Sequence, residues 1–232
     1  MTLPIKNGWF GRKRHIRLYM DLSTTCDIRC VQCFREAIIP PPMKVTRAQL
    51  EILEREVFPY IERLSLSCTG EPLYLPIFPE ALRAAKRAGV PYVRIQTNAT
   101  HLDEAMSALL LDEGLSHLGV SLDAATKETF ERIRVGADWE MVTGNIRRFV
   151  EMRNARRRVE PEVSLNFTLM TDNCHEALPL IDLARDLGVT SISYHHMIVE
   201  RPEMKSHNLA YDPPRMNALL QSLREQAAAR GV

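Results

Sequence analysis

The sequence predicts an α/β fold in which six βα units build one parallel sheet. Short runs rich in Val, Ile and Leu alternate along the chain with longer amphipathic runs, which is typical of βα units. The 232 residues are 45% hydrophobic and 25% charged, as in an ordinary globular domain. No linker-like or low-complexity stretch divides the chain. We therefore expect a lead-in at residues 1–15 and a single domain at residues 16–232.

Six short segments are predicted to be strands because they are rich in Val, Ile and Leu. They are residues 16–23, 63–68, 92–98, 117–123, 162–169 and 191–197. The amphipathic segments between and after them are predicted to be helices. These are residues 47–60, 79–88, 103–112, 127–133 with 139–153, 175–187 and 213–230. Thr46, Asp103 and Asp138 lie where helix N-caps belong.

Three of the predicted helices run into a glycine and an apolar residue before the next strand, at residues 88–90, 113–115 and 187–189. Glycine ends a helix readily because it adopts the left-handed conformation. The chain itself ends in the same way, at Gly231-Val232, as though a seventh strand were to follow. We therefore expect this sequence to be part of a longer one. A frayed tail that ends in Gly-Val by chance is the alternative.

Charge and hydropathy exclude several classes of partner. A formal net charge of +1 gives no overall field to hold nucleic acid or anionic lipid. Residues 1–10 lack the apolar run of a signal peptide, and no stretch approaches the roughly 20 apolar residues of a membrane-spanning helix. We therefore expect a cytoplasmic protein without membrane or nucleic-acid partners. In that reducing compartment, clustered cysteines indicate metal or redox chemistry.

Three of the five cysteines cluster as a CxxxCxxC motif, Cys26, Cys30 and Cys33, after the first predicted strand. Thiolates at this spacing can converge on one metal centre, either zinc or an iron-sulfur cluster. A structural zinc site needs a fourth protein ligand, whereas a 4Fe-4S cluster with three cysteines leaves one iron open. Cys68 and Cys174 have no cysteine or histidine neighbour at ligand spacing, so we interpret both as ordinary thiols.

Further candidate site residues, nearly all of them polar, lie at the carboxyl ends of the predicted strands. These ends form the reactive face of parallel βα folds. The candidates are Thr69, Gly70 and Glu71, then Thr97 and Asn98, then Ser121 and Asp123, and finally Tyr194, His195 and His196. The fifth strand also places Ser164, Asn166 and Thr168 on one face. Burying such a polar face is costly unless a polar cofactor hydrogen-bonds to it.

Together these motifs resemble the radical S-adenosylmethionine (SAM) enzymes. The resemblance rests on the three cysteines, Thr69-Gly70-Glu71-Pro72, Gln96-Thr97-Asn98 and Val120-Ser121-Leu122-Asp123. It covers about residues 16–197 and is closest to the branch that usually carries a C-terminal SPASM or twitch extension. We expect this chain to lack that extension, because no cysteine follows Cys174. The architecture implied is a partial parallel (β/α)6 TIM-like barrel.

The resemblance also implies roles for individual residues. Cys26, Cys30 and Cys33 would hold a 4Fe-4S cluster, whose open iron would chelate the amino and carboxylate groups of SAM. The residues expected to bind SAM are Gly70, Glu71, Asn98, Ser121, Asp123, Arg134, Asn166 and Met197. Among them, Gly70 and Glu71 would orient the methionine ammonium, and Arg134 would pair with the carboxylate. Ser121 would bind the carboxylate or the ribose, with help from Asp123. Asn166 would contact the ribose or the adenine, and Met197 would pack on the adenine.

The sequence departs from the family pattern at two positions. The residue before the third cysteine is commonly an aromatic side chain that packs on the adenine, but here it is Gln32, and Phe34 is a possible substitute. Thr69-Gly70 replaces a pair of glycines. Neither departure affects the expected cluster, whereas the first leaves the adenine contact open.

The function implied is reductive cleavage of SAM to a 5'-deoxyadenosyl radical that abstracts hydrogen from a substrate, as an iron-sulfur oxidoreductase or in transferase-type chemistry. A low-potential donor such as flavodoxin or ferredoxin would supply the electron. Resemblance to the SPASM branch points to a peptide substrate, while a small metabolite remains open. Tyr194, His195 and His196 would contact the substrate or have a structural role.

The alternative is a non-catalytic metal-binding or partner protein with a structural three-cysteine metal site. Such a site would not need Glu71, Ser121 or the polar strand face.

Overall fold

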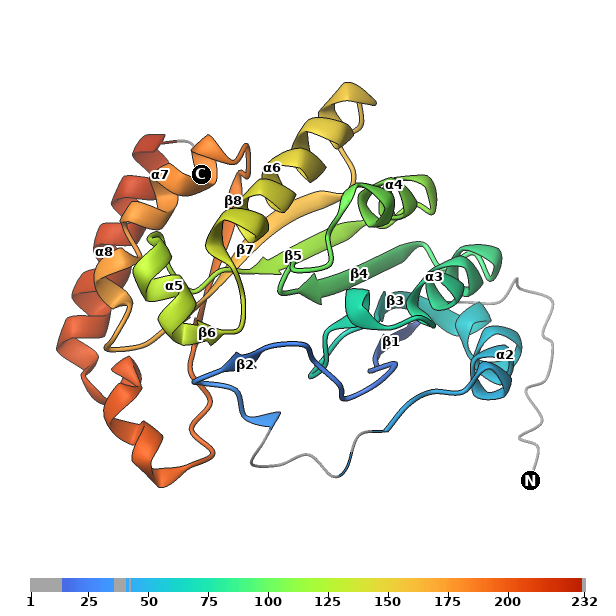
Figure 1. Ribbon diagram of the computed structural model, residues 1–232, viewed down its shortest axis with the longest axis horizontal. Coiled ribbons are helices and arrows are strands. Elements are labelled where there is room, and N and C mark those ends of the chain that lie inside the picture. Colours follow the sequence, from blue (N-terminus) through green and yellow to red (C-terminus); the bar gives the residue numbers. More distant parts are fainter. Residues whose placement is uncertain (1–13, 36–40, 42, 231–232) are drawn as a thin grey trace.

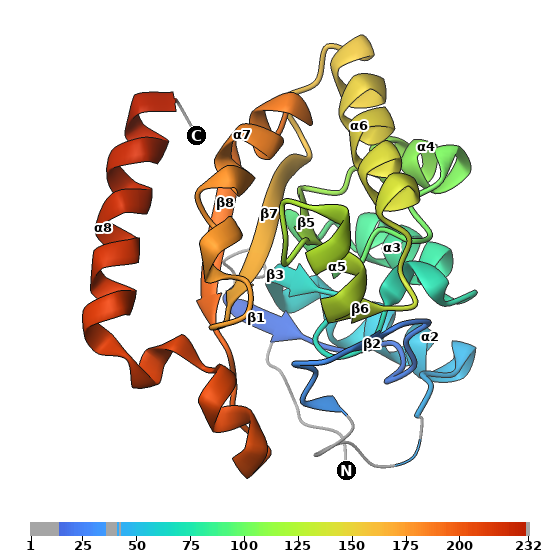
Figure 2. The same ribbon diagram turned by 60° about the vertical axis from the view of Figure 1, so that its left-hand side comes forward.

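Six parallel strands form the sheet that organises the fold, in the order β1-β3-β4-β5-β7-β8. Every neighbouring pair runs parallel. The sheet is curled, and helices cover its outer side (Figures 1 and 2). The strands are β1 (Ile16–Tyr19), β3 (Ile61–Ser65), β4 (Tyr92–Thr97), β5 (His117–Ser121), β7 (Glu162–Leu169) and β8 (Ser191–His196). The carboxyl ends of all six therefore meet at one edge.

The fold is that of a computed structural model, which describes residues 14–35, 41 and 43–230. Arg14 and His15 alone represent the expected lead-in at 1–15. The Gly231-Val232 ending, on which the expectation of a longer chain depends, lies outside the described residues.

The helices of the described residues alternate with the strands, as the sequence predicts. The longer ones are α2 (Arg47–Glu56), α3 (Phe78–Arg87), α4 (Glu104–Asp112), α5 (Lys127–Ile133), α6 (Trp139–Ala155), α7 (Pro179–Asp186) and α8 (Pro213–Arg230). Short 3-10 helices are η1 (Phe58–Tyr60), η2 (Pro72–Tyr74), η3 (Cys174–Glu176), η4 (Pro202–His207) and η5 (Leu209–Tyr211). The bounds of β7, α5 and α8 are those predicted.

Two predicted helices are shorter than expected, and proline is the reason in both. The segment predicted at 47–60 ends as α2 at Glu56, because Pro59 lacks an N–H and its ring disfavours the preceding helical turn. The segment predicted at 175–187 begins as α7 only at Pro179, which suits the first position of a helix. The predicted strand at 16–23 is also shorter than expected and ends at Tyr19, although no proline follows it there.

The three predicted N-caps and the three junction glycines are confirmed. The Thr46 hydroxyl accepts from the Gln49 backbone N–H at 3.2 Å, Asp103 from Met106 at 2.8 Å and Asp138 from Met141 at 2.7 Å. The three glycines at the helix-to-strand junctions, Gly89, Gly114 and Gly188, have φ angles of +65°, +74° and +72°. They turn the chain out of the helix, as expected.

A second, two-stranded sheet was not predicted. Strand β2 (Arg29–Cys30) pairs antiparallel with β6 (Arg134–Val135), so that Cys30 lies opposite Arg134. Strands of two residues carry no periodic pattern, and these are about a hundred residues apart in the chain. We call residues 26–33, which carry the three cysteines of the motif, the cysteine segment. This small sheet attaches the cysteine segment to the end of α5.

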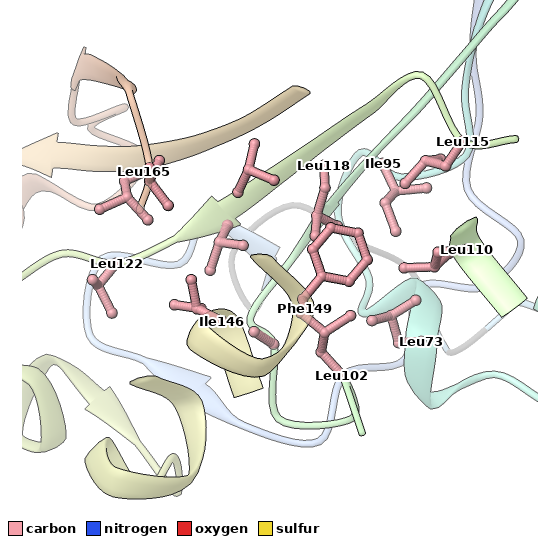
Figure 3. Packing of buried hydrophobic residues seen from close by; sticks show 14 of the residues in the cluster. Leu73, Ile95, Leu102, Leu110, Leu115, Leu118, Leu122, Ile146, Phe149 and Leu165 are labelled. Atoms are coloured by element: carbon pink, nitrogen blue, oxygen red, sulfur yellow. The ribbon is translucent and has the colours of Figure 1, made fainter. Parts of the chain in front are cut away.

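The core lies between the curled sheet and the helices outside it. Figure 3 shows Leu118 and Leu165 of the sheet facing Ile146 and Phe149 of α6. Leu102 and Leu110 close the core beside α4. All six side chains are at most 1% exposed. This packing holds the strand ends, and the residues they carry, in fixed positions.

Helix α8 stands beside α7 on the outer side of β8 (Figure 2). Only Met216 and Leu223 of this helix are buried. Among the described residues, no helix has the length and apolar character needed to cross a membrane.

Candidate active site

A cavity of about 400 Å³ opens at the carboxyl ends of the strands. Its walls come from the cysteine segment, the loop after β3 and the ends of β4, β5, β7 and β8. The lining residues are Cys26, Ile28, Cys30, Gln32, Cys33, Phe34, Ser67, Cys68, Thr69, Gly70, Glu71, Gln96, Thr97, Asn98, Ser121, Arg134, Asn166, Thr168, His195, His196, Met197 and Ile198. Ten of the eleven predicted site residues therefore share one cavity, of a size ordinary for a small-molecule site.

The three cysteines of the motif line one side of this cavity and are partly exposed. Burial raises the pKa of Cys30 to about 11, although the Arg134 guanidinium opposes the rise, and burial also raises the pKa of Cys26. Metal binding would therefore have to displace protons from these thiols. Among the described residues, no three His, Cys, Asp or Glu side chains are grouped so that they could hold a single metal ion.

The cysteine segment is held from two sides. On one side the Val31 N–H donates to the Ile133 carbonyl at 2.9 Å, beside the β2–β6 pair. On the other, Asp27 accepts from Asn98 Nδ2 at 2.8 Å and from Thr100 Oγ1 at 2.6 Å. Asn98 Nδ2 also lies 3.9 Å from Cys26 Sγ. Asn98 was expected at the SAM, and the structure adds that it ties the cysteine segment to the end of β4.

The loop after β3 depends on Asp21, which sequence reasoning missed. The Asp21 carboxylate accepts from the backbone N–H groups of Cys68 and Thr69 at 2.7 and 2.9 Å and from the Thr69 hydroxyl at 2.7 Å. The sequence gives little sign of this role, because the predicted strand at 16–23 includes Asp21, whereas the observed strand ends at Tyr19 and leaves Asp21 in the irregular segment that follows. Its contacts fix the direction in which the loop carries Gly70 and Glu71.

Glu71 is only 3% exposed although it lines the cavity. Its carboxylate accepts from the Thr97 hydroxyl at 2.6 Å and from the backbone N–H groups of Asn98 and Leu73 at 2.7 and 3.1 Å. Burial nevertheless raises its pKa to about 7. The carboxylate therefore joins the end of β4 to the loop after β3. It also lines the cavity, so a cation bound there would favour the charged form of Glu71.

The polar inner face predicted for β7 is present. Asn166 is 6% exposed, and its Oδ1 lies 3.3 Å from His195 Nε2. Its Nδ2 is buried without a partner. On the neighbouring strands, Ser121 Oγ accepts from Gln96 Nε2 at 3.0 Å and Ser164 Oγ lies 3.0 Å from His117 Nε2.

Asp123 is the predicted site residue that the structure does not bring to the cavity. It is 0% exposed, and its carboxylate accepts from Arg134 Nη2 at 2.6 Å, Gln32 Nε2 at 2.6 Å and the Thr168 N–H at 2.7 Å. Any help that Asp123 gives in binding SAM would therefore act through the residues that it holds, and it stays a prediction. The side chain lies behind the wall, where it holds Arg134 and Gln32.

The remaining candidates divide between the cavity and the structure. Met197, His195 and His196 line the cavity, as does Phe34. Tyr194 does not: its hydroxyl donates to the Ala177 carbonyl at 2.7 Å, and burial raises its pKa. A structural role therefore applies to Tyr194.

The two other cysteines also differ from each other. Cys68 is exposed and lines the cavity. Cys174 is buried and lies 2.9 Å from Arg215 Nη2 at the start of α8, away from the cavity lining. The interpretation of Cys174 as an ordinary buried thiol fits this position.

The cavity suits a large polar cofactor beside a thiolate-bound cluster. In a cluster each cysteine binds a different iron, so the three thiols need not meet at one point as they would around a single ion. Seven buried side-chain polar atoms of the described residues have no partner, and three belong to cavity residues, namely Gln32, Arg134 and Asn166. Unpartnered buried polar atoms at a cavity indicate a missing polar ligand.

A family model described as the radical SAM superfamily matches residues 20–184 of this chain. Among curated proteins, a probable GTP 3',8-cyclase of Methanococcus maripaludis is 25% identical over 203 residues, covering 86% of this chain and 65% of that protein. The Fe-coproporphyrin III synthase of Methanosarcina barkeri is 25% identical over 199 residues, covering 84% of this chain and 47% of that protein. The chain thus spans between about half and two thirds of the length of these relatives.

Solved structures show the same fold. Streptococcus suis SuiB bound to S-adenosylmethionine superposes with a TM-score of 0.66 at 17% identity, over 93% of this chain and 45% of SuiB. Native anSMEcpe with bound AdoMet gives a TM-score of 0.68 at 17% identity, over 89% of this chain and 58% of that one. The predicted partial parallel (β/α)6 TIM-like barrel is confirmed.

Proposed function

The chain belongs to the radical SAM superfamily, whose enzymes use a 4Fe-4S cluster and SAM, and from this premise we propose that its cavity holds both cofactors. Cys26, Cys30 and Cys33 would bind the cluster, and SAM would occupy the space between them and the strand ends. The single observation that carries the proposal is that all three cysteines and the predicted SAM contacts, apart from Asp123, line one cavity.

When bound, the cluster supplies the electron that cleaves SAM into methionine and a 5'-deoxyadenosyl radical, which removes a hydrogen atom from the substrate. The chain's own residues orient SAM and exclude water. Glu71 is a buried carboxylate next to Gly70, so it would attract the methionine ammonium and be held charged by it. Arg134, which also lines the cavity, would attract the carboxylate.

Ser121 and Asn166 would bind the uncharged polar groups of SAM. Both lie on the inner face of the sheet, in register with each other on β5 and β7. The amide of Asn166 has a donor without a partner, which suits a ribose hydroxyl or an adenine nitrogen. Met197, which is 3% exposed, would pack on the adenine, and Phe34, which also lines the cavity, is a further candidate for that contact.

We propose that a low-potential protein such as flavodoxin or ferredoxin donates the electron, and that the substrate is a peptide or a small molecule. SuiB has been solved with its precursor peptide, whereas the curated relatives carry the names of a cyclase and a synthase. His195 and His196 line the cavity mouth beside Ile198 and would contact the substrate. We also propose a cytoplasmic location, where reducing conditions would keep Cys26, Cys30 and Cys33 available to bind the cluster.

The alternative of a structural three-cysteine metal site has less support. A single ion would require three ligands around one point, and the described residues offer no such group. Such a site would also not account for the buried carboxylate of Glu71 or the polar face of β7.

Anaerobic reconstitution tests the proposal. The protein is loaded with iron and sulfide, reduced with dithionite and given SAM, and 5'-deoxyadenosine is quantified by chromatography. We expect turnover from the wild type and from Cys174→Ala, a buried cysteine outside the cavity, but none from Cys30→Ala. No product from the wild type, or equal product from Cys30→Ala, would refute catalysis by this cluster.

A further inference from the structure

We infer that Asp123 keeps the reduction potential of the cluster low by neutralising Arg134, the cation beside Cys30, without itself contacting SAM. The inference rests on the proposed function, because it concerns the cluster that Cys30 would hold. It assigns a role to a buried ion pair in which Arg134 lines the cavity and Asp123 lies behind it.

The pair is enclosed by protein. The side chain of Asp123 is 0% exposed and that of Arg134 is 7% exposed. Arg134 Nη2 donates to Asp123 Oδ2 at 2.6 Å, and the Thr168 N–H donates to Asp123 Oδ1 at 2.7 Å. Because water does not surround these groups, their charges are weakly screened. An unpaired charge here would act strongly on its neighbours.

Arg134 lies directly beside a cluster ligand. Its Nη1 is 3.8 Å from Cys30 Sγ, and the backbones of the two residues pair across β2 and β6. Main-chain pairing fixes the two backbones relative to each other, and burial of the Arg134 side chain limits where its guanidinium can move when the carboxylate partner is removed. Asp123 therefore decides whether Cys30 faces a neutral pair or a full positive charge.

The sign of the effect follows from the charge of the electron. Reduction adds one negative charge to the cluster, and a nearby uncompensated cation stabilises the reduced form and raises the potential. Cys26 would bind the same cluster, and the charged groups that act on it are Asp27, Glu71 and Arg35. With Asp123 in place, the pair adds little net charge, which preserves the low potential that the cleavage of SAM requires.

Gln32 provides a neutral comparison at the same carboxylate. Its Nε2 donates to Asp123 Oδ2 at 2.6 Å, from the position directly before Cys33. This contact attaches the cysteine segment to the ion pair without adding charge. Its loss would loosen the segment but leave the charge at Cys30 unchanged.

Potentiometric titration followed by electron paramagnetic resonance measures the potential in the reconstituted full chain. We expect Asp123→Asn to shift the midpoint to more positive values and Arg134→Gln to shift it to more negative values. The double variant D123N/R134Q should return close to the wild type, because it restores a neutral pair of similar shape. Gln32→Met should leave the midpoint unchanged, which separates charge from packing.

Shifts in the same direction for Asp123→Asn and Arg134→Gln, or no shift in either, would overturn the inference. If Asp123→Asn does not fold, Arg134→Gln and the double variant decide, and a midpoint of Arg134→Gln equal to the wild type overturns it. A wild-type chain that takes up no cluster would instead refute the proposed function, and the inference with it. The spectrum of the loaded wild type therefore distinguishes the two failures.

Discussion

Gly70 lies so close to Ser23 that a β-carbon on Gly70 would come within 2.3 Å of the Ser23 carbonyl oxygen. The same carbon would lie 2.8 Å from the Thr25 carbonyl oxygen, and the Glu71 N–H donates to that oxygen at 2.9 Å. Two backbones thus touch, one leading to Cys26 and the other to Glu71. This contact sets the distance between the cysteine segment and the predicted ammonium site.

We predict that Gly70→Ala destabilises the protein and abolishes SAM binding. A β-carbon cannot fit without moving a backbone, and overpacking of this kind costs about 1–3 kcal/mol or more. Gly144→Ala is the matched control, because a β-carbon on Gly144 of α6 meets nothing within 4 Å. It should stabilise the helix by about 0.5–1 kcal/mol. Urea unfolding and calorimetric titration with SAM measure both effects, and wild-type values for Gly70→Ala would contradict the argument.

Asp21→Ala should weaken SAM binding on the order of tenfold. The loop that carries Gly70 and Glu71 would lose its hydrogen bonds to the carboxylate, at a cost of about 1–3 kcal/mol in stability. Asp103→Ala also removes a carboxylate that accepts a backbone N–H, but at the start of α4. It should cost about 1 kcal/mol of stability and leave SAM affinity unchanged. Equal losses of affinity in both variants would show that Asp21 has no special role at the site.

The stability of the cofactor-free protein should fall as pH rises from about 4.5 to about 7. Burial raises the pKa of Glu71 from 4.5 in the unfolded chain to about 7 in the folded one. In that interval the folded state holds more protons than the unfolded state, so raising the pH favours unfolding, by about 3 kcal/mol in all. Glu71→Gln removes this contribution. Denaturant unfolding at pH 5 and pH 7.5 should show a smaller decrease for the variant, and identical decreases would rule out Glu71 as the source.

Asn166→Leu should separate binding from stability. The Asn166 Nδ2 atom is buried without a partner, so a leucine of similar volume removes an unpaired polar group and should change the stability of the cofactor-free protein by no more than about 1 kcal/mol. Loss of one hydrogen bond to SAM should weaken binding about tenfold. Ser164→Ala serves as the control on the same strand, because Ser164 already bonds to His117. Calorimetry would count against this role if Asn166→Leu bound SAM as tightly as the wild type.

Much of the site could be located from the sequence because parallel strands end at one edge. The cysteine motif, Glu71, Ser121 and Asn166 each follow or lie on a predicted strand, and all line the cavity. Their individual contacts with SAM stay predictions. The roles of Asp21 and Asp27 could not be predicted from the sequence, because a single aspartate near a turn has no distinguishing pattern and each acts on residues that are far from it in the chain.

The sequence by itself determined the six βα units, the helix caps and the cysteine motif, since these depend on local periodicity and on residue types at short spacing. Only the tertiary structure decided that Asp123 lies behind the cavity wall and holds Arg134 and Gln32 there. It also decided that Cys30 pairs with Arg134 across two short strands. The physical reason is that burial and long-range pairing depend on how the whole sheet curls, and two-residue strands or single polar side chains carry no trace of that in the local sequence.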